Sequence, residues 1–204
     1  MTTNENIERF ERLLRSTNRD GIENLISFIQ KSDFYTAPAS TRFHSCHEGG
    51  LLEHSLYVYD RFVAKFTDDL WAEKVNVSRD SLIIIALLHD LTKCYFYGTE
   101  LKNKKVYSDM GKKSDSNGRY DWVTAPAYTV DDKFPMGHGE KSMYLAERFI
   151  RLSKTEAMAI RWHMLWTEPK ELYNTIGNAI KLYPIILALH EADMEATYLL
   201  EKEE

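Results

Sequence analysis

Residues 83–94 read IIIALLHDLTKC, and this stretch decides the fold. Its apolar run is much shorter than the roughly 20 residues that a membrane-spanning helix needs, so it indicates the buried part of a helix in a globular protein. The run ends on His89 and Asp90. Because an unpaired charge is costly to remove from water, we expect Asp90 to meet a cation, several hydrogen-bond donors or a metal ion.

The composition predicts one domain over residues 1–204. The chain is 44% hydrophobic, which is enough for a sizeable core. We find neither a basic-then-apolar leader nor an apolar stretch of about 18 residues, and therefore expect a cytoplasmic protein with no membrane contact. Cys46 and Cys94 form no CxxC pair, so we expect reduced thiols. The oligomeric state stays open, with a homodimer as one alternative.

Apolar residues recur at helical spacing along most of the chain, which predicts an all-α bundle. Two short stripes predict a helical pair over residues 1–35 that packs on the rest of the domain. Gly49 and Gly50 precede a longer stripe, Ser153 and Glu156 have the spacing of a capping box, and Pro184 suits the first turn of a last helix. The stripes comprise Ile7, Phe10, Leu14; Ile22, Leu25, Ile26, Ile29; and Leu52, Leu56, Tyr59, Phe62, Val63, Phe66.

Residues of about 100–135 interrupt the helical pattern. The turn-forming KKSDSNGR precedes YDWVTAPAYTV, which predicts a hairpin or a long ordered loop. Residues 100–120 carry six Lys or Arg against three Asp or Glu, a local charge of +3 in a chain of net charge −5. A solvated loop is one interpretation. The other is a lid that binds an anionic substrate through Lys102, Lys104 and Lys105, with Trp122 stacking on a base.

Several polar side chains fall on faces that should be buried. Asp193 shares a stripe with Ile186, Leu189, Ala196, Thr197 and Leu200. His138 begins a helical stripe, His163 follows another, and His54 lies beside a third. Each His alone is more often a satisfied core or surface residue. Together with His89 and Asp90 they form the imidazole and carboxylate set that suits zinc, iron, manganese or nickel.

The phrases GGLLEHSLYV and ALLHDLTK, with the order His54, His89–Asp90, His138, His163, Asp193, resemble the HD-domain metal-dependent phosphohydrolases. This is an all-helical superfamily, and the phrases look most like the HD domain of bacterial 3'-to-5' exoribonucleases. The resemblance implies that His54, His89, Asp90 and Asp193 bind one metal. It further implies a second metal on His138 and His163, with Asp90 as a bridge. The resemblance covers residues 40–200 as an HD core. Thr92 stands where the family often has Gly, and we expect no counterpart of the nucleic-acid-binding barrel that precedes the HD domain in those exoribonucleases.

The residues also suggest the chemistry. A bound divalent ion lowers the pKa of its water and polarises a phosphoryl oxygen, so we expect one or two ions among Mn, Ni, Fe, Zn, Co and Mg, with Asp90 catalytic. Lys93 follows His89 by four residues and can neutralise charge on the phosphate, although a solvated helix-end lysine is an equal interpretation. His44 stands where relatives often have histidine, and we expect it to contact substrate.

We therefore expect a metal-dependent phosphohydrolase that acts on a nucleotide or a short nucleic-acid phosphoester. A 3'-to-5' exonuclease on oligonucleotides is a close variant. The alternatives from other classes are a di-iron oxygenase of a small organic substrate and a non-catalytic nucleotide sensor. The inward charges speak against the sensor, because they would be costly without metal.

Overall fold

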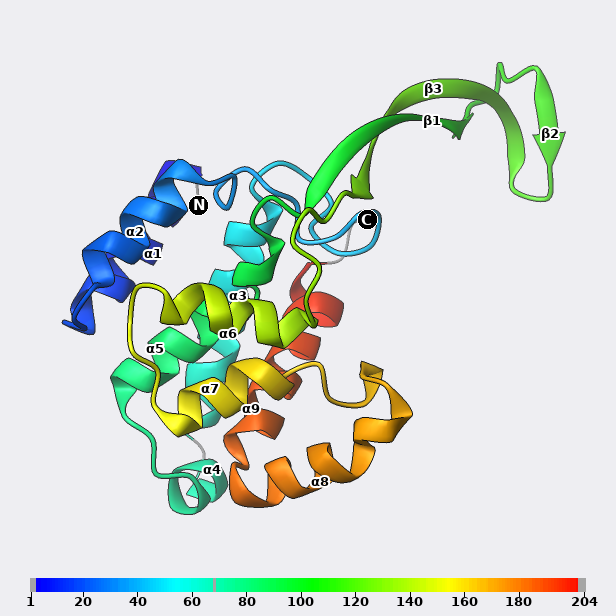
Figure 1. The fold of residues 1–204 in the computed structure, drawn as a ribbon. Helices are drawn as coiled ribbons and strands as arrows, with labels where there is room; N and C mark the ends of the chain where they lie inside the picture. The colour runs from blue at the N-terminus through cyan, green and yellow to red at the C-terminus, as the bar shows by residue number, and fades with distance from the viewer. Residues whose placement is uncertain (1–2, 68, 202–204) are drawn as a thin grey trace.

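The computed structural model describes residues 3–67 and 69–201, so residues 1–2, 68 and 202–204 of the predicted domain lie outside it. Figure 1 shows a helical body from which a β-stranded arm projects. None of the described helices is long and apolar enough to cross a membrane. The helices are α1 Thr3–Ser16, α2 Ile22–Lys31, α3 Gly50–Lys65, α4 Asp69–Lys74, α5 Arg79–Leu88, α6 His138–Glu147, α7 Lys154–Trp162, α8 Tyr173–Leu182 and α9 Ile185–Glu195. The short turns are η1 Leu91–Lys93, η2 Leu165–Thr167, η3 Lys170–Leu172 and the π-helical η4 Ala196–Leu200.

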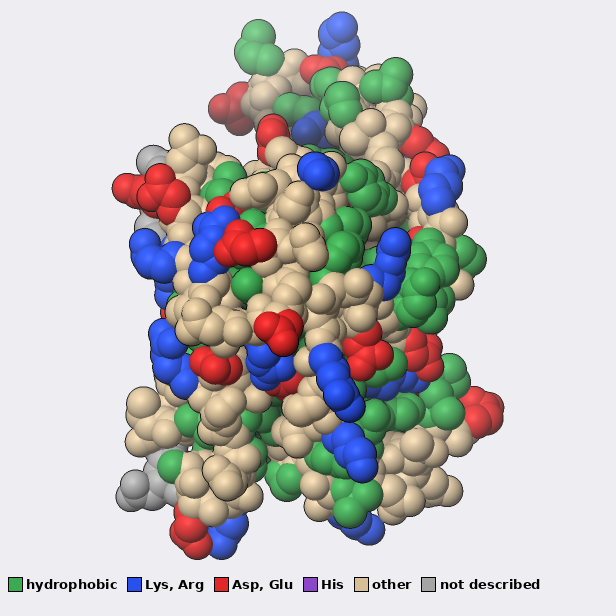
Figure 2. Space-filling view, turned by 60° about the vertical axis from the view of Figure 1, so that its left-hand side comes forward, with side chains coloured by type: hydrophobic (Ala, Val, Ile, Leu, Met, Phe, Trp, Pro, Cys, Tyr) green, Lys and Arg blue, Asp and Glu red, His purple; other side chains and the backbone are tan. Residues whose placement is uncertain are grey.

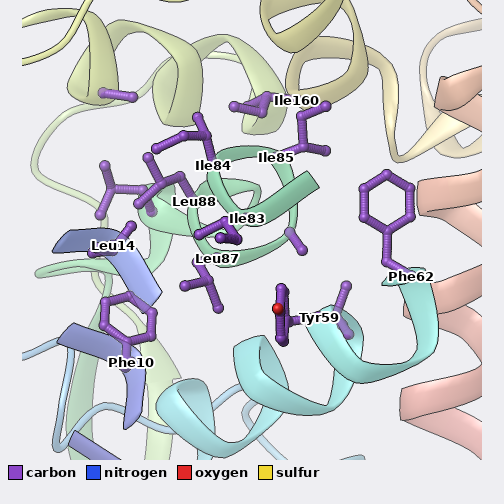
Figure 3. Packing of buried hydrophobic residues seen from close by; sticks show 14 of the residues in the cluster. Phe10, Leu14, Tyr59, Phe62, Ile83, Ile84, Ile85, Leu87, Leu88 and Ile160 are labelled. Atoms are coloured by element: carbon purple, nitrogen blue, oxygen red, sulfur yellow. The ribbon is translucent and has the colours of Figure 1, made fainter. Parts of the chain in front are cut away.

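Helix α5 is the centre of the body. Its run from Ile83 to Leu88 is fully buried on all sides. Figure 3 shows these side chains between Phe10 of α1, Tyr59 of α3 and Ile160 of α7. Each large aliphatic side chain buried in this way contributes about 1.5–3 kcal/mol. The apolar run therefore fixes the end of α5, and with it His89 and Asp90, inside the protein.

The helix-start signals in the sequence are confirmed. Ser153 and Glu156 form both hydrogen bonds of a capping box before α7, and Pro184 directly precedes α9. Gly49 has a φ of 83°, in the left-handed region, at the start of α3. A Cβ on Gly50 would lie 2.0 Å from the carbonyl oxygen of Ser45, so only glycine allows this loop to approach α3 so closely.

The predicted excursion from the helical bundle is confirmed as a hairpin, so the class is predominantly helical with a small sheet rather than all-α. Strands β1 Tyr97–Tyr107, β2 Lys113–Asp115 and β3 Gly118–Val130 form an antiparallel sheet in the order β1-β3-β2. The long pairing runs from Tyr97 opposite Val130 to Tyr107 opposite Tyr120. β-Branched and aromatic residues in this segment suit strands rather than a loop. The fold is thus predominantly helical, with one sheet that forms the arm (residues 97–130).

Contacts at both ends of the arm attach it to the body. The Tyr97 hydroxyl donates a hydrogen bond to the carbonyl oxygen of Ala39 at 2.9 Å. After the arm, Asp132 forms an ion pair with Lys141 of α6, whose side chain is only 2% exposed. The Lys141 ammonium also lies 5.4 Å from the ring centroid of Phe96, just before the arm. Both ends of the arm are therefore fixed to the body.

Candidate metal centre

The carboxylate of Asp90 lies among four imidazoles that come from different helices. Its Oδ1 is 2.7 Å from Nε2 of His138 and 3.8 Å from Nε2 of His163. Its Oδ2 is 3.4 Å from Nε2 of His54 and 3.6 Å from Nε2 of His89. Every one of these imidazoles thus turns the same ring atom, Nε2, toward one carboxylate.

His89 and His163 are oriented by the same local device. Each is the residue that follows the last turn of a helix, where backbone carbonyls lack partners within the helix. Nδ1 of His89 lies 2.8 Å from the carbonyl oxygen of Ala86, and Nδ1 of His163 lies 2.7 Å from that of Ile160. A carbonyl can only accept, so Nδ1 carries the proton in both rings. In the neutral rings, Nε2 then faces inward with a free lone pair.

His54 is oriented by a carboxylate instead. Its Nδ1 lies 2.8 Å from Oε1 of Glu201, whose Oε2 accepts a hydrogen bond of 2.8 Å from the Ser45 hydroxyl. Its Nε2 lies 3.3 Å from Oδ1 of Asp193. Burial alone would lower the pKa of His54, but Asp90, Glu201 and Asp193 outweigh it and raise the pKa to about 10. Without a metal, the proton on His54 thus compensates part of the negative charge.

The cluster fits a metal ion. Nε2 of His54, His89 and His163 are buried and have no hydrogen-bond partner among the described residues. A buried polar atom without a partner costs about 1–3 kcal/mol, which coordination would remove. Burial lowers the pKa of His163 to about 3, assisted by the neighbouring His89 and His138, so this ring stays neutral as a ligand must.

Two overlapping ligand groups share Asp90. The first is His54, His89 and Asp90; the second is Asp90, His138 and His163, and within each the ligand atoms lie within 4.8 Å of one another. His89, His163 and Asp193 form a third such combination. Imidazole nitrogens with carboxylate oxygens suit zinc, iron, manganese or nickel. The arrangement can therefore hold one ion or two adjacent ions.

A cavity of about 870 Å³ opens beside the cluster. Lys93 lines it, with its Nζ 2.7 Å from Oδ2 of Asp90. His44 also lines the cavity, with its ring centroid 5.3 Å from that of His54. Much of the remaining lining is apolar or aromatic, from Phe43, Phe96, Tyr97, Val130, Met164, Met194 and Tyr198. The cavity thus has both polar and apolar lining residues.

The structure brings together the six predicted ligands, Lys93 and His44, but not the predicted contacts on the arm. Lys102, Lys104, Lys105 and Trp122 lie beyond the arm's base, and none of them lines the cavity. Figure 1 shows the strands curving away from the helices, so the arm does not form the expected lid in this arrangement. Only its ends, Tyr97 and Val130, reach the cavity wall.

Two residues of the site were missed in the sequence. Glu201 is only 7% exposed, whereas Leu200, predicted to face inward, is 47% exposed. The cause is the π-helical turn, in which the backbone N–H of Glu201 donates to the carbonyl oxygen of Ala196, five residues earlier. This adds a residue to the turn and shifts the inward face by one position. Arg42, which lines the cavity, lies in a loop without periodicity.

No family model matches the chain, and no solved structure matches it significantly. One curated protein that it resembles is the dihydroneopterin 2',3'-cyclic phosphate phosphodiesterase of Methanocaldococcus jannaschii, with 45% identity over 62 residues. The similar stretch covers 30% of this chain and 24% of that protein, so the match spans about a quarter of the relative's length. The relative's name describes hydrolysis of a cyclic phosphodiester.

Proposed function

We propose that this protein is a metal-dependent phosphohydrolase of the HD type, which hydrolyses a phosphoester of a nucleotide-like molecule. The observation that carries the proposal is the convergence on the carboxylate of Asp90 of three imidazole nitrogens that have no hydrogen-bond partner in the described part of the chain. The similarity of a 62-residue stretch to a cyclic phosphate phosphodiesterase supports the same class of reaction.

The first ion would be held by His54, His89, Asp90 and Asp193, and a second by His138 and His163 together with Asp90. When bound, a divalent ion supplies hydroxide at neutral pH and polarises a phosphoryl oxygen. Lys93 lines the cavity beside Asp90, where its ammonium can stabilise negative charge that develops on the phosphoryl group. Burial lowers the pKa of His44, so its neutral ring can both donate and accept a hydrogen bond with the substrate.

The cavity wall favours a substrate that carries both an anionic group and a flat ring. Arg42 has no ion-pair partner among the described residues, and its guanidinium lies 5.1 Å from the ring centroid of Phe43. A guanidinium presents a planar fork of donors that matches phosphate oxygens. Phe96 and Tyr97, which also line the cavity, offer an aromatic surface to a heterocyclic base. We therefore place a nucleotide-sized phosphoester in this cavity.

The contacts predicted for Lys102, Lys104, Lys105 and Trp122 distinguish a short substrate from a long one. Lys105 already forms an ion pair with Asp115 and lies 4.4 Å from the ring centroid of Tyr120. A mononucleotide in the cavity would not extend along the arm, whereas an oligonucleotide could. Neutralising the three lysines should therefore leave mononucleotide hydrolysis unchanged. A rise in KM for oligonucleotides alone would identify the exonuclease variant of the proposal.

The direct test is phosphate or alcohol release from 2',3'-cyclic nucleotides, nucleoside phosphates and short oligonucleotides, each with Mn, Ni, Fe, Zn, Co or Mg. We expect metal-dependent hydrolysis of at least one class. Asp90→Asn should abolish it, while Asp60→Asn, which removes an exposed carboxylate bound to Arg9, should not. The proposal fails if no phosphoester is hydrolysed with any metal. Oxygen consumption by the iron-loaded protein without hydrolysis would support the oxygenase alternative instead.

A further inference from the structure

The arm (residues 97–130) exposes apolar side chains along its whole length. Leu101 is 73% exposed, Met110 87% and Trp122 50%. Because residues paired across the strands share a face, Leu101 and Trp122 lie on the face of Tyr97, whereas Val123 lies on the opposite face. A two-stranded ribbon with no packing partner is only marginally stable in water. The exposed apolar side chains of the arm therefore indicate that it packs against a partner. The other exposed apolar residues are Val106, Tyr107 and Val130.

The charge of the chain favours a second copy as that cover. The arm carries six Lys or Arg and four Asp or Glu, which gives it a net charge of +2. Since the net charge of the whole chain is −5, the remaining residues together carry −7. The basic arm of one copy is attracted to the acidic body of a second copy. A two-fold axis between the copies allows both arms to bind at the same time. Figure 2 shows acidic and basic side chains interspersed on one face of the body, so that face alone does not account for the excess of acidic residues.

Strand order restricts how the two copies meet. β1 is an edge strand and carries Lys102, Lys104 and Lys105. Pairing this edge with the same edge of a second arm would set lysines against lysines, which natural sheets use to prevent edge association. Beyond Tyr120 the outer edge of β3 is also unpaired among the described residues, but Pro126 removes one backbone donor from it. We therefore expect the arm to present a face to the partner's body rather than an edge to the partner's arm.

The body offers an exposed apolar surface at the end of its last helix. In this surface, here named the α9–η4 end, Leu199 is 70% exposed and Leu200 47%. Met194 and Tyr198 are also exposed, at 42% and 57%, and both line the cavity. The exposed apolar side chains of the α9–η4 end on one copy can therefore pack against those of the arm on the other copy.

We propose that the protein is a two-fold symmetric dimer in which the arm of each copy packs across the α9–η4 end of the other, at the rim of its cavity. The aliphatic Leu101, Val106 and Val123 favour a protein surface over nucleic acid, because only aromatic rings stack on bases. This dimer does not depend on the reaction that the cavity supports.

The test is the mass of the full chain in solution by light scattering after size exclusion. We expect about twice the chain mass of 23.8 kDa. In an arm-less variant, Asn-Gly replaces residues 99–128 and joins Gly98 to Thr129, which are paired across the two strands. This variant should have the mass of one chain, with an unchanged melting temperature for the body.

Two double variants keep the test valid if the arm-less protein does not fold. Leu101→Ser with Val123→Ser on the arm, and Leu199→Ser with Leu200→Ser on the body, should each give single chains. Leu182→Ser, a matched control at a 75% exposed position of α8, should stay dimeric. The proposal is overturned if the wild type has the mass of one chain at low and moderate salt, or if the arm-less variant stays dimeric. It is equally overturned if the wild type is a single chain whose mass increases only when a single-stranded oligonucleotide is added.

Discussion

Glu201 accepts a hydrogen bond of 2.8 Å from Nδ1 of His54, which links the last turn of the chain to α3 across the site. Carboxylates that bind the outer nitrogen of a histidine fix its tautomer and raise its basicity toward a metal. Glu201 itself is held by the Ser45 hydroxyl, which donates to its other oxygen. The metal ligand His54 is thus expected to depend on a residue that binds no metal.

Replacing Glu201 by Ala should weaken metal affinity about 10–100-fold, because His54 loses the partner that fixes its ring. Competition with a metal-binding indicator dye gives the affinity. Glu195→Ala is the matched control, since Glu195 pairs with Lys65 and Arg61 on the surface instead. Equal affinities of the two variants would exclude an orienting role for Glu201.

The sequence was sufficient to predict the elements that follow from short-range rules. Helical periodicity identified α1, α2, α3, α5, α6, α7 and α9 but not α4 or α8. The stripes of α6, α7 and α9 indicated that His138, His163 and Asp193 face the core. The structure brings these residues together with His54, His89 and Asp90, although binding of metal by them stays a prediction. These residues were predictable because a helix with one apolar face has only one orientation in a core.

The sequence was insufficient where long-range contacts determine the outcome. No sequence rule predicts a π-helical turn, and the turn η4 is accompanied by long-range contacts of Glu201 with His54 and Ser45. The sequence therefore could not show that Glu201, rather than Leu200, faces inward. The hairpin was predicted from its residues, but its direction relative to the cavity depends on how its ends are attached. Lys102 and Trp122 were therefore assigned to a lid that this arrangement does not form.

Lys93→Met should lower kcat/KM for a phosphoester about 10²–10³-fold, the usual effect of removing one group that stabilises transition-state charge. Its ammonium lies 2.7 Å from Oδ2 of Asp90, so metal content must be measured in the same samples. We expect that content to be unchanged. If instead activity survives, Lys93 is only a counter-ion of Asp90. Lys133→Met serves as the control, because Lys133 pairs with Asp131 outside the cavity.

Glu156 should stabilise the protein in a pH-dependent manner. Burial would raise its pKa, but Arg19, Ser81 and the backbone of Ser153 outweigh it and hold the pKa below the ordinary 4.5. Because the folded pKa is below the unfolded one, the contribution is complete above pH 4.5 and is lost as the pH falls through the folded pKa.

Glu156→Gln should therefore destabilise the protein by about 1–3 kcal/mol at pH 7, with the difference from wild type shrinking in acid. Urea unfolding at pH 7 and at successively lower pH gives both values. A difference that is constant with pH would show that packing, rather than charge, accounts for the effect. Glu23→Gln, at an exposed carboxylate that pairs with Arg15, is the control.

The central claim, that the cluster around Asp90 binds a divalent metal, is tested most directly by elemental analysis. Protein purified without chelator is supplied with Mn, Ni, Fe or Zn, desalted and analysed beside Asp90→Ala and the surface control Asp60→Ala. We predict at least one ion per chain in the wild type and in Asp60→Ala, a large loss in Asp90→Ala, and a melting temperature that metal raises only where it binds. A wild type that retains no more of any metal than Asp90→Ala would contradict the account.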